Sequence, residues 1–438
     1  MTETIGVVGA GYVGATTAAG FAHLGYRVGV VDTDPSKVSG MLVGHSGLAE
    51  PGLDDMIDLA VRTGRLTASD RYEILADATI VFVCVPTPMR SDGAADLTFI
   101  DAAVGGLRPT LRPGGIVVLK STVPVGTGDA VAESVRDLGV HVVNNPEFLR
   151  EGHTVRDFLN PDRVVVGGET APAARVAALY RDIGAPTSCV DRCSAELAKY
   201  ACNSFLALKL SFVDELARLA EHLGADIDQV TDIMGRDERI GREFLRPGPG
   251  WGGSCFPKDT RALASIAEAV GCSMRTLTAA IDANEAQSER IVDLVVDAVG
   301  VDGHVALWGL TFKAGTADLR ESPALKIADA LSKQGLRVSA HDPTVTDHTA
   351  LEARLPARFD CERAQVALLE VLSDPCSIRP DTDAIVVATE WEEYGSIDWS
   401  VVARRAPHAL VLDTRGVVDG QAVRAAGLEF RRLGVAYG

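Results

Sequence analysis

A glycine-rich stretch near the start of the sequence has the residue types of a phosphate-binding loop. In Gly9-Ala10-Gly11-Tyr12-Val13-Gly14, the first glycine permits a tight turn, the second lets the backbone approach a pyrophosphate, and the third lets a helix pack closely on a strand. Asp32 follows eighteen residues after Gly14, where its carboxylate could accept both ribose hydroxyls and would repel a 2′-phosphate. The spacing predicts a dinucleotide site that prefers NAD to NADP. An ordinary glycine-rich turn is the alternative interpretation.

A second glycine-rich stretch carries a cysteine in the surroundings of a nucleophile. In the segment 252–259, GGSCFPKD, Cys255 is close in sequence to Lys258 and Asp259, which could activate a thiolate. A free cysteine is more often a small buried apolar residue, so we assign packing roles to the other seven. These are Cys84, Cys189, Cys193, Cys202, Cys272, Cys361 and Cys376. The spacing of Cys189 and Cys193, without a matching His or Cys pair, does not suggest a zinc site, and no metal is predicted.

Three further groups of polar residues could complete an active site. Lys199 and Asn203 are four residues apart in a helical pattern, so they share a helix face. Glu147 and Glu151 follow a predicted strand, and the segment 120–127, KSTVPVGT, follows another; α/β enzymes bind ligands at such strand ends. Each group also has a structural interpretation, as a solvated helix face, as surface charge or as a helix cap.

The elements that must position these residues are short apolar strands alternating with helical patterns. The strand runs are continuously apolar, as in parallel strands that are buried on both faces, so the pattern predicts a doubly wound α/β sheet. The predicted strands are Thr4–Val8, Arg27–Asp32, Thr79–Val85, Gly115–Ser121, Val140–Asn144 and Arg163–Val166. The alternation of strand and helix patterns returns near His304 and predicts a second, smaller α/β domain. Its predicted strands are Val305–Gly309, Arg337–His341, Ala384–Thr389 and Ala409–Asp413.

Between these parts, the segment from Ser194 to Gly224 predicts one long amphipathic helix. Apolar residues recur every three or four positions from Leu197 to Leu223, and no proline interrupts them. Ser194 is the expected N-cap and Gly224 the expected C-terminal stop. A helix of this length is longer than a small domain is wide, so we interpret it as a spine between two domains and as a candidate dimer surface.

Composition and charge limit the classes of partner. The chain has 438 residues, of which 47% are hydrophobic and 23% charged, which excludes wholesale disorder. Its net charge of −18 argues against nonspecific binding to nucleic acid or to an anionic membrane, but a local site could still hold an anionic small ligand. The sequence shows no signal peptide and no run of eighteen apolar residues, so we expect a cytoplasmic, soluble protein with reduced thiols.

Motifs spread over nearly the whole chain resemble the UDP-glucose/GDP-mannose dehydrogenase family, and within it the branch of UDP-glucose 6-dehydrogenases. The matching stretches occur in family order and together are very specific. They are GAGYVG (9–14), EPGL (50–53), VPTP (85–88), DGAADL (92–97), KSTVPVGT (120–127), NPEFLREG (145–152), PDRVVVG (161–167), AELAKYACNSFLA (195–207), GPGWGGSCFPKD (248–259), FKAGTADLRESPAL (312–325) and VVATEW (386–391).

The resemblance implies two Rossmann-like α/β domains joined by the long central helix. By resemblance, residues 1–193 form an NAD-binding domain, 194–300 a helical dimerisation region with the cysteine loop, and 301–438 a domain that binds the UDP-sugar. The implied reaction oxidises the C6 alcohol of a nucleotide sugar to the carboxylate with two NAD. A thiolate would trap the intermediate aldehyde as a thiohemiacetal, a second oxidation would give a thioester, and water would hydrolyse it. A homodimer through the central helix is also implied.

The resemblance also implies roles for individual residues. Cys255 matches the nucleophile, Lys199 the lysine that stabilises the oxyanion, Asn203 its partner, and Asp259 the acid/base. The remaining catalytic positions are Thr122, Glu147 and Glu151. The cofactor positions are Gly9, Gly11, Tyr12, Val13, Gly14, Asp32, Lys37, Pro86, Thr87, Ser121, Thr122, Glu151 and Arg320. The substrate positions are Glu147, Phe148, Leu149, Lys199, Asn203, Phe244, Leu245, Gly252 and Lys313.

A few positions depart from the family pattern, and several alternatives stay open. Trp251 stands where phenylalanine is usual, Ala314 and Ala317 replace proline and aspartate, and Gly416 replaces the asparagine after Arg415. The same chemistry on dTDP-glucose, GDP-mannose or a UDP-hexosamine is the main alternative, because one methyl group on the base is worth only about 1–3 kcal/mol. A two-electron dehydrogenase and a nucleotide-sugar binding protein without turnover are the others. The joint presence of the cysteine, lysine, asparagine and aspartate argues against the binding protein.

Overall fold

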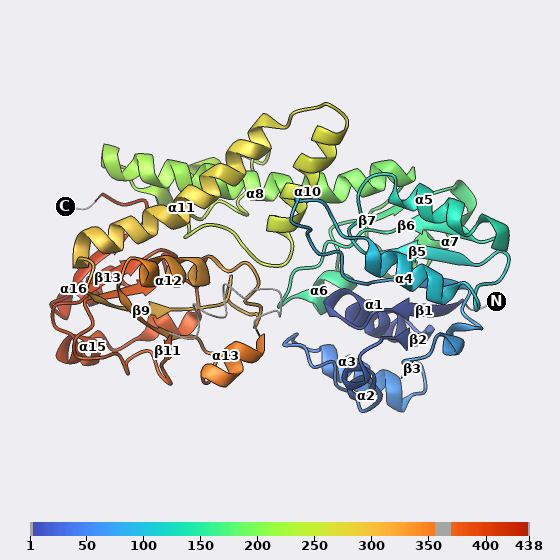
Figure 1. Ribbon diagram of the computed structural model, residues 1–438, viewed down its shortest axis with the longest axis horizontal. Helices are drawn as coiled ribbons and strands as arrows, with labels where there is room; N and C mark the ends of the chain where they lie inside the picture. The colour runs from blue at the N-terminus through green and yellow to red at the C-terminus, as the bar shows by residue number, and fades with distance from the viewer. Residues whose placement is uncertain (1–2, 355–368, 437–438) are drawn as a thin grey trace. The chain divides into compact units, whose positions relative to one another are not determined.

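The computed structural model describes residues 3–354 and 369–436 of the chain (Figure 1). The chain forms two compact units. Unit 1 comprises Met1–Cys202 and Arg261–Cys272, and unit 2 comprises Asn203–Thr260 and Ser273–Gly438. The division of the chain into three segments at residues 193 and 300 stays a prediction. In the described residues, no helix is long and apolar enough to cross a membrane.

Unit 1 contains an eight-stranded sheet in the order β3-β2-β1-β4-β5-β6-β7-β8. All neighbouring strands are parallel except β6 and β7, which pair antiparallel at Asn144 and Gly167. The first six strands of this order have the arrangement of a dinucleotide-binding fold. The strands are β1 (Thr4–Val8), β2 (Arg27–Val31), β3 (Leu66–Ser69), β4 (Ile80–Val83), β5 (Ile116–Leu119), β6 (His141–Asn144), β7 (Val164–Gly167) and β8 (Thr187–Val190).

Helices cover both faces of this sheet, as the continuously apolar strands require. One core packs α1, α3, α6 and α7 against one face, and a second core packs α4 and α5 against the other. The helices are α1 (Tyr12–His23), α2 (Pro35–Leu42), α3 (Leu53–Arg62), α4 (Thr98–Leu107), α5 (Thr127–Ser134), α6 (Thr154–Leu159) and α7 (Thr170–Ala178), with short 3-10 turns η1 (Tyr72–Leu75), η2 (Arg136–Leu138) and η3 (Arg181–Ile183).

Unit 2 contains a six-stranded parallel sheet in the order β11-β10-β9-β12-β13-β14, which repeats the order of the first six strands of unit 1. Its strands are β9 (His304–Trp308), β10 (Arg337–His341), β11 (Glu370–Val371), β12 (Ala384–Val387), β13 (Leu410–Asp413) and β14 (Glu429–Arg432). One core packs α11 and α12 on the sheet, and another packs η4, α15 and α16. The helices are α9 (Ile227–Gly235), α11 (Arg275–Val299), α12 (Pro323–Lys333), α13 (His348–Arg354), α15 (Trp399–Arg405) and α16 (Gly420–Ala425), with the 3-10 turn η4 (Glu392–Ser396).

The two sheets also share a detailed arrangement at the end of their first strand. Gly9 and Gly309 both have φ near +95° (97° and 95°), and the N–H of each donates to the last strand residue of the neighbouring strand at 2.7 Å. The next N–H donates to a carboxylate, Asp32 in unit 1 at 2.6 Å and Asp342 in unit 2 at 2.8 Å. A side chain at either glycine would collide with the strand on the other side. The same backbone geometry therefore requires a glycine after the first strand of each sheet.

Two helices, α8 (Arg192–Leu223) and α10 (Phe256–Ala269), contribute residues to both units. The predicted N-cap of α8 at Ser194 is wrong, because the helix begins two residues earlier. Asp191 accepts hydrogen bonds from the backbone N–H of Ser194 at 2.8 Å and from its hydroxyl at 2.6 Å, so Asp191 caps the helix. The predicted stop is confirmed, since Gly224 follows the helix with a φ of +72°.

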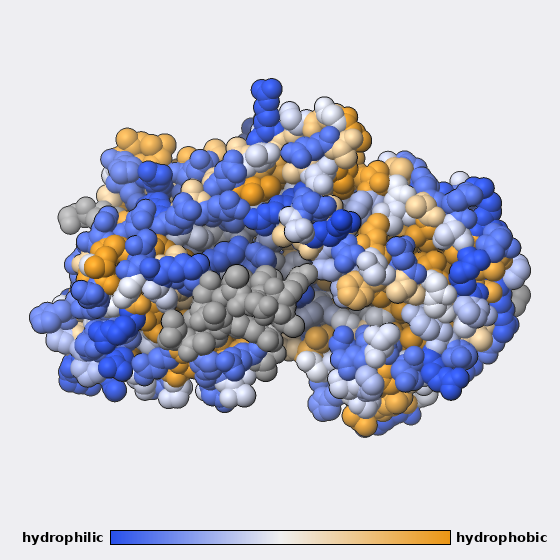
Figure 2. Space-filling view, in the orientation of Figure 1, coloured by the Kyte–Doolittle hydropathy of each residue, from blue (hydrophilic) through white to orange (hydrophobic). Residues whose placement is uncertain are grey.

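The exposed side of α8 carries an apolar stripe. Phe205, Phe212 and Leu219, spaced by seven residues, are 64%, 53% and 51% exposed, and Leu197 and Leu223 are also exposed. Figure 2 shows hydrophobic residues, in orange, interspersed with hydrophilic ones, in blue, on the part of the surface where α8 and α11 run in Figure 1. The opposite face of the helix is buried, and it carries the polar residues described below.

All ten predicted strands are present, with ends that shift by up to two residues, but four strands were missed: β3, β8, β11 and β14. All four missed strands lie at the edges of the two sheets, and they are short or mixed in polarity, such as the EFRR of β14. A continuous apolar run identifies only strands that are buried on both faces, so it does not detect these.

Two glycine substitutions test the packing of α1 on α6. A Cβ on Gly20 of α1 would lie 2.1 Å from the buried ring of Phe158, whereas a Cβ on Gly105 of α4 would meet nothing within 4 Å. Gly20→Ala should lower the free energy of unfolding by about 1–3 kcal/mol, and Gly105→Ala should raise it by up to about 1 kcal/mol. Equilibrium unfolding in urea measures both changes. Equal effects of the two substitutions would contradict this packing.

Candidate active site

The glycine-rich loop of unit 1 has the geometry of a pyrophosphate cradle. A Cβ on Gly14 would lie 1.8 Å from the carbonyl oxygen of Gly9, so glycine is required where α1 packs on β1. A Cβ on Gly11 would meet nothing within 4 Å, which leaves the backbone open on the side that a ligand can approach. Helix α1 begins directly after Gly11, so Tyr12 and Val13 lie in its first turn, where the positive end of the helix dipole favours phosphate.

The other predicted cofactor residues of unit 1 lie at the carboxyl ends of neighbouring strands. After β2, Asp32 accepts hydrogen bonds from the N–H groups of Ala10 (2.6 Å) and Asp34 (2.9 Å), and Lys37 lies 3.7 Å away. After β4 and β5, Thr87 donates to the carbonyl of Thr122 at 2.8 Å, and Ser121 donates to that of Val85 at 2.7 Å. Pro86 lies between these tied positions. The loops after β4 and β5 are thus joined beside the glycine-rich loop, where a dinucleotide fits.

A buried ion pair follows β6. Lys199 of α8 donates to Glu147 at 3.1 Å, and both side chains are less than 10% exposed. The backbone N–H of Leu149 also donates to Glu147, at 2.6 Å. Burial alone would raise the pKa of Glu147, but the charge of Lys199 and these hydrogen bonds outweigh it and lower the pKa. Glu147 is therefore held as a carboxylate, with Lys199 as its counter-ion.

The ion pair lies among further cations and beside Phe148, a predicted substrate residue. Lys120 is buried beside it and donates to the side-chain oxygen of Asn145 at 3.0 Å; burial lowers the pKa of Lys120 to about 8. Phe148 lies beneath two cations, with the Arg163 guanidinium 3.9 Å and the Lys199 ammonium 5.3 Å from its ring. The loop therefore has a positively charged environment of the kind that anionic ligands require.

Glu50 holds the C-terminal end of the loop that follows β6. Glu151 lies at this end of the loop. The buried carboxylate of Glu50 accepts hydrogen bonds from the N–H of Gly152 at 2.6 Å, and from the N–H and hydroxyl of Thr154 at 3.1 Å and 2.9 Å. Glu50 belongs to the EPGL motif, a hundred residues earlier in the sequence. The motif was recognised from the sequence, but its contact with the loop depends on the tertiary fold.

In unit 2, Cys255 immediately precedes the first turn of α10. The N–H of Asp259 donates to the carbonyl of Cys255 at 2.9 Å, and the side chain of Ser254 lies 3.5 Å from the sulfur. A helix N-terminus favours negative charge, so this position favours a thiolate. Asp259 is fully buried, and it accepts hydrogen bonds from Asn203 of α8 at 2.6 Å and from Lys258 at 2.5 Å. The structure thus brings together Asn203, Asp259 and the cysteine loop.

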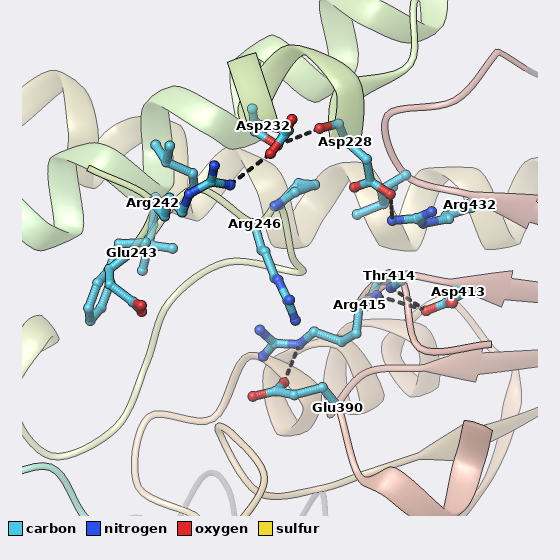
Figure 3. Close-up of a pocket in the computed structure, with 17 residues that line it drawn as sticks. Asp228, Asp232, Arg242, Glu243, Arg246, Glu390, Asp413, Thr414, Arg415 and Arg432 are labelled. Atoms are coloured by element: carbon cyan, nitrogen blue, oxygen red, sulfur yellow. Dashed lines mark hydrogen bonds and ion pairs between the residues drawn. The ribbon is translucent and has the colours of Figure 1, made fainter. Parts of the chain in front are cut away.

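A pocket of about 820 Å³ lies within unit 2, and two predicted substrate residues, Phe244 and Leu245, line it. Figure 3 shows the side chains of Arg246 and Arg415 pointing toward each other across this pocket. Arg415 is held in place by the carbonyls of Ala388 (2.9 Å) and Phe312 (3.1 Å) and by Glu390 (3.1 Å). Two facing guanidinium groups are a chemistry that can bind a diphosphate.

Neither arginine was among the predicted site residues. The signal for Arg415 was its position two residues after β13, at the carboxyl end of a parallel strand. The glycine at position 416, where the sequence departs from the family's asparagine, also has a physical reason. Gly416 has a φ of +68°, and a Cβ there would lie 2.5 Å from the guanidinium of Arg432. The glycine therefore accommodates Arg432, which binds Asp228 at 2.6 Å on the wall of the pocket.

Three other predicted residues of unit 2 do not line this pocket. Arg320 forms a two-pronged ion pair with Asp318 at 2.9 Å and 2.6 Å. Lys313 lies 5.8 Å from the ring of Phe312. Gly252 packs against the backbone, since a Cβ there would lie 2.0 Å from the carbonyl oxygen of Glu321.

The cysteines other than Cys255 do not all have packing roles. Cys84 is buried as predicted, and burial raises its pKa to about 12. Cys189 and Cys272 are exposed, so the prediction is wrong for both; Cys189 lies on the edge strand β8, and Cys272 lies in a surface turn. The other described ones, Cys193, Cys202 and Cys376, are half-buried, and Cys361 lies outside the described residues.

Comparisons with known proteins cover the whole chain. Residues 3–184, 193–286 and 306–420 match the NAD binding domain, the central domain and the UDP binding domain of the UDP-glucose/GDP-mannose dehydrogenase family. The chain is 39% identical to a UDP-glucose 6-dehydrogenase of Pseudomonas aeruginosa, over 98% of this chain and 96% of the relative. It is 37% identical to one of Rhizobium meliloti, over 98% and 99%. The structure of a UDP-glucose dehydrogenase from Pyrobaculum islandicum superimposes with a TM-score of 0.89 at 35% identity, over 100% of this chain and 98% of that one.

One buried carboxyl predicts a pH dependence of stability. Burial raises the pKa of Asp214 to about 7, an effect that its hydrogen bond from Gly248 and the charge of Arg415 only partly offset. Between about pH 4 and 7, the folded chain holds a proton that the unfolded chain releases, so this group destabilises the fold as the pH rises. Asp214→Asn can still accept the hydrogen bond and has no such proton. Its stability relative to wild type should increase from pH 4 to 7, at up to about 1.4 kcal/mol per pH unit.

Unfolding in denaturant at several pH values measures this difference. Glu289→Gln, which removes a charge from an exposed position of α11, is the control for the loss of one carboxylate. A difference between Asp214→Asn and wild type that does not change with pH would contradict the assignment.

Proposed function

Because the chain belongs to the UDP-glucose/GDP-mannose dehydrogenase family, we propose that it oxidises the C6 alcohol of UDP-glucose to the carboxylate of UDP-glucuronate, with two NAD consumed per sugar. The protein is an NAD-dependent oxidoreductase, and its substrate is a nucleotide sugar. The proposal rests above all on the position of Cys255 before α10, with Asp259 buried four residues later. A cysteine placed there is needed for a four-electron oxidation and not for a two-electron one.

The cofactor fits the loops of unit 1. Gly9, Gly11 and Gly14 with the first turn of α1 would hold the pyrophosphate, and Asp32 would accept the hydroxyls of the adenosine ribose. The ties between Thr87, Ser121 and the backbone give the adjoining loops a fixed shape for the remainder of the cofactor. When bound, NAD accepts the hydride that each oxidation releases.

The first oxidation requires loss of a proton from the C6 hydroxyl and stabilisation of the resulting oxyanion. We assign the oxyanion to Lys199, which is buried and fixed by Glu147, and to Asn203, one turn further along α8. Glu147, which is held as a carboxylate, and Asp259 are the candidate bases. Thr122 and Glu151 would order the water, and Phe148 and Leu149 would contact the sugar nucleotide.

The second oxidation requires a covalent intermediate. The Cys255 thiolate adds to the C6 aldehyde and forms a thiohemiacetal, whose loss of a proton to a base and of a hydride gives a thioester. Water then attacks the thioester carbonyl, releases the carboxylate and restores the thiol. The placement of Cys255 at a helix N-terminus supports this role, since that position stabilises the thiolate and the oxyanions that form beside it.

The pocket of unit 2 supports a diphosphate-linked substrate. The chain carries a net charge of −18, so an anionic ligand needs a local concentration of cations. Carboxylates of the lining pair with its other arginines and with Arg415, so the local cationic feature is the facing pair Arg246 and Arg415; Phe244 and Leu245 supply apolar contacts at the same wall. We therefore propose this pocket as the site of the nucleotide diphosphate. The identity of the base is not determined by these contacts, and so dTDP-glucose, GDP-mannose and a UDP-hexosamine stay as alternative substrates.

The apolar face of α8 supports a homodimer. Phe205, Phe212 and Leu219 repeat every seven residues along one exposed stripe, which two antiparallel copies of α8 could bury around a two-fold axis. We propose that the protein is a homodimer through this helix. The cytoplasmic location predicted from the sequence stays a prediction.

The stoichiometry of NADH tests the reaction. With limiting UDP-glucose, we expect two NADH per sugar and a uronate product; one would indicate a dehydrogenase that stops at the aldehyde, and none a binding protein. The same measurement with dTDP-glucose, GDP-mannose and UDP-hexosamines, compared by kcat/KM, tests the substrate.

Cys255→Ser should lower turnover by roughly two orders of magnitude or more. Cys272→Ser, at an exposed cysteine, should leave turnover unchanged.

The dimer is tested by a charge on the apolar stripe. Phe212→Glu places a carboxylate at a half-exposed position that would be desolvated in the interface, so the variant should sediment as a monomer in analytical ultracentrifugation where the wild type sediments as a dimer. Val270→Glu, at a residue that is 72% exposed outside α8, is the control and should stay dimeric. A Phe212→Glu variant that stays dimeric would exclude this surface.

A further inference from the structure

The segment that leads to Cys255 is buried but has little means of holding itself in place. Residues 248–253 are Gly-Pro-Gly-Trp-Gly-Gly, and all six are buried. Gly250 and Gly253 have φ values of +108° and +83°, in the left-handed region. Glycine is the most flexible residue, and buried backbone N–H and C=O groups must find partners. Something outside the segment must therefore fix its conformation.

Two helices of the same unit provide these partners. From α8, Asp214 accepts a hydrogen bond from the N–H of Gly248 at 2.8 Å. From α11, Gln287 donates to the carbonyl of Gly248 at 2.7 Å, and Ser288 donates to that of Pro249 at 3.0 Å. The first two residues of the segment are thus held by side chains that belong to helices, which are rigid.

Asn284 of α11 makes the most complete of these contacts. Its side-chain oxygen accepts a hydrogen bond from the N–H of Trp251 at 2.6 Å, and its NH₂ group donates to the carbonyl of Trp251 at 3.1 Å. One side-chain amide therefore pairs with both backbone groups of one residue, as a neighbouring strand would. This contact also explains why residue 250 is a glycine, because a Cβ on Gly250 would lie 2.8 Å from the Asn284 side-chain oxygen.

The side chain of Trp251 adds a contact that the phenylalanine usual in the family lacks. Its indole N–H donates to the hydroxyl of Ser211 on α8 at 2.9 Å, and that hydroxyl donates to the carbonyl of Ala280 at 2.7 Å. The indole also packs edge-on against Phe256, the residue after Cys255, with ring centres 6.4 Å apart. Trp251 is therefore fixed at its backbone and its side chain, and it contacts the residue next to the thiol.

Beyond Trp251, packing constrains the remaining residues before the cysteine. A Cβ on Gly252 would lie 2.0 Å from the carbonyl of Glu321, and the N–H of Gly253 donates to the carbonyl of Arg320 at 3.1 Å. On the other side of Cys255, the contact between Asn203 and Asp259 holds α10. Cys255 thus has fixed points on both sides, and Asn284 supplies one of those that precede it.

We propose that Asn284 is a positioning residue for Cys255, which it places for attack on the aldehyde by pairing with both backbone groups of Trp251. The proposal rests on the proposed function of Cys255 as a nucleophile. Asn284 does not touch the reacting atoms, and the first oxidation does not need the thiol. Its loss should therefore slow the second oxidation more than the first.

Asn284→Asp is the sharpest test, because it keeps the size and the acceptor but replaces the donor with an oxygen that opposes the carbonyl of Trp251. We expect the first oxidation of UDP-glucose to slow by less than about threefold and the second by at least tenfold. NADH per sugar should then fall from two toward one, and the aldehyde should appear in solution, where a hydrazide probe traps it. The KM for UDP-glucose should change less than kcat.

A second measurement separates this proposal from the proposed function. The rate of alkylation of Cys255 by iodoacetamide, followed by mass spectrometry of its peptide without substrate, should change at least fivefold in Asn284→Asp. If the wild type itself yields one NADH per sugar, the four-electron function fails, and the alkylation rate alone decides whether Asn284 positions the thiol. The NADH ratio does not depend on how much of the protein is folded, and the alkylation rate is measured on the isolated folded fraction.

Ala286→Asp is the matched control, since it adds the same charge to the exposed face of α11, two residues away. It should keep two NADH per sugar and the wild-type alkylation rate. Should Asn284→Asp fail to fold, Asn284→Ser loses both contacts without adding a charge and is tested in the same way. Unchanged stoichiometry and alkylation in the folded variant, or the same changes in Ala286→Asp, would overturn the proposal.

Discussion

The constraint on which this structure depends is that a polar group taken out of water must find a partner within the chain. Several of the described functional candidates are buried polar groups, and each of those named here has such a partner. Glu147 has Lys199, Asp259 has Asn203 and Lys258, and the backbone of Trp251 has Asn284. These partners leave each reactive group few conformations. The candidate site is therefore preorganised by the same contacts that make its burial possible.

A second constraint is geometric, and it operates twice. Both parallel sheets have the same strand order and end their first strand in a left-handed glycine, followed by an N–H that donates to an aspartate. In unit 1 the loop beyond that glycine is open, which suits a pyrophosphate. In unit 2, Asp342 also accepts from Thr311, Thr344 and Trp391, so its carboxylate is saturated by the chain. The same fold can thus present an open ligand loop or close it, according to what surrounds one carboxylate.

Helix α8 shows how one element serves several requirements at once. Its buried face carries Lys199 and Asn203 among the candidate catalytic residues, and Ser211 and Asp214 among those that hold the cysteine loop. Its exposed face carries an apolar stripe. A helix can divide roles in this way because residues three or four apart share a face, whereas residues at other spacings point elsewhere. A shift of one residue in its register would disturb each of these contacts together.

The sequence by itself determined the fold class, the ten strands buried on both faces, the long helix and its glycine stop, and the dinucleotide loop, because these depend on local periodicity and on backbone conformations that few residues adopt. It did not determine the strands at the sheet edges, which lack a continuous apolar run, nor the start of α8 at Arg192 with its cap Asp191. Only the tertiary structure decided which distant groups meet: Glu50 with Gly152, Arg246 facing Arg415, and Asn284 with Trp251. Such contacts join residues that are tens of positions apart, and no spacing in the sequence records them. They arise when buried polar groups find partners, which happens only after the elements have packed.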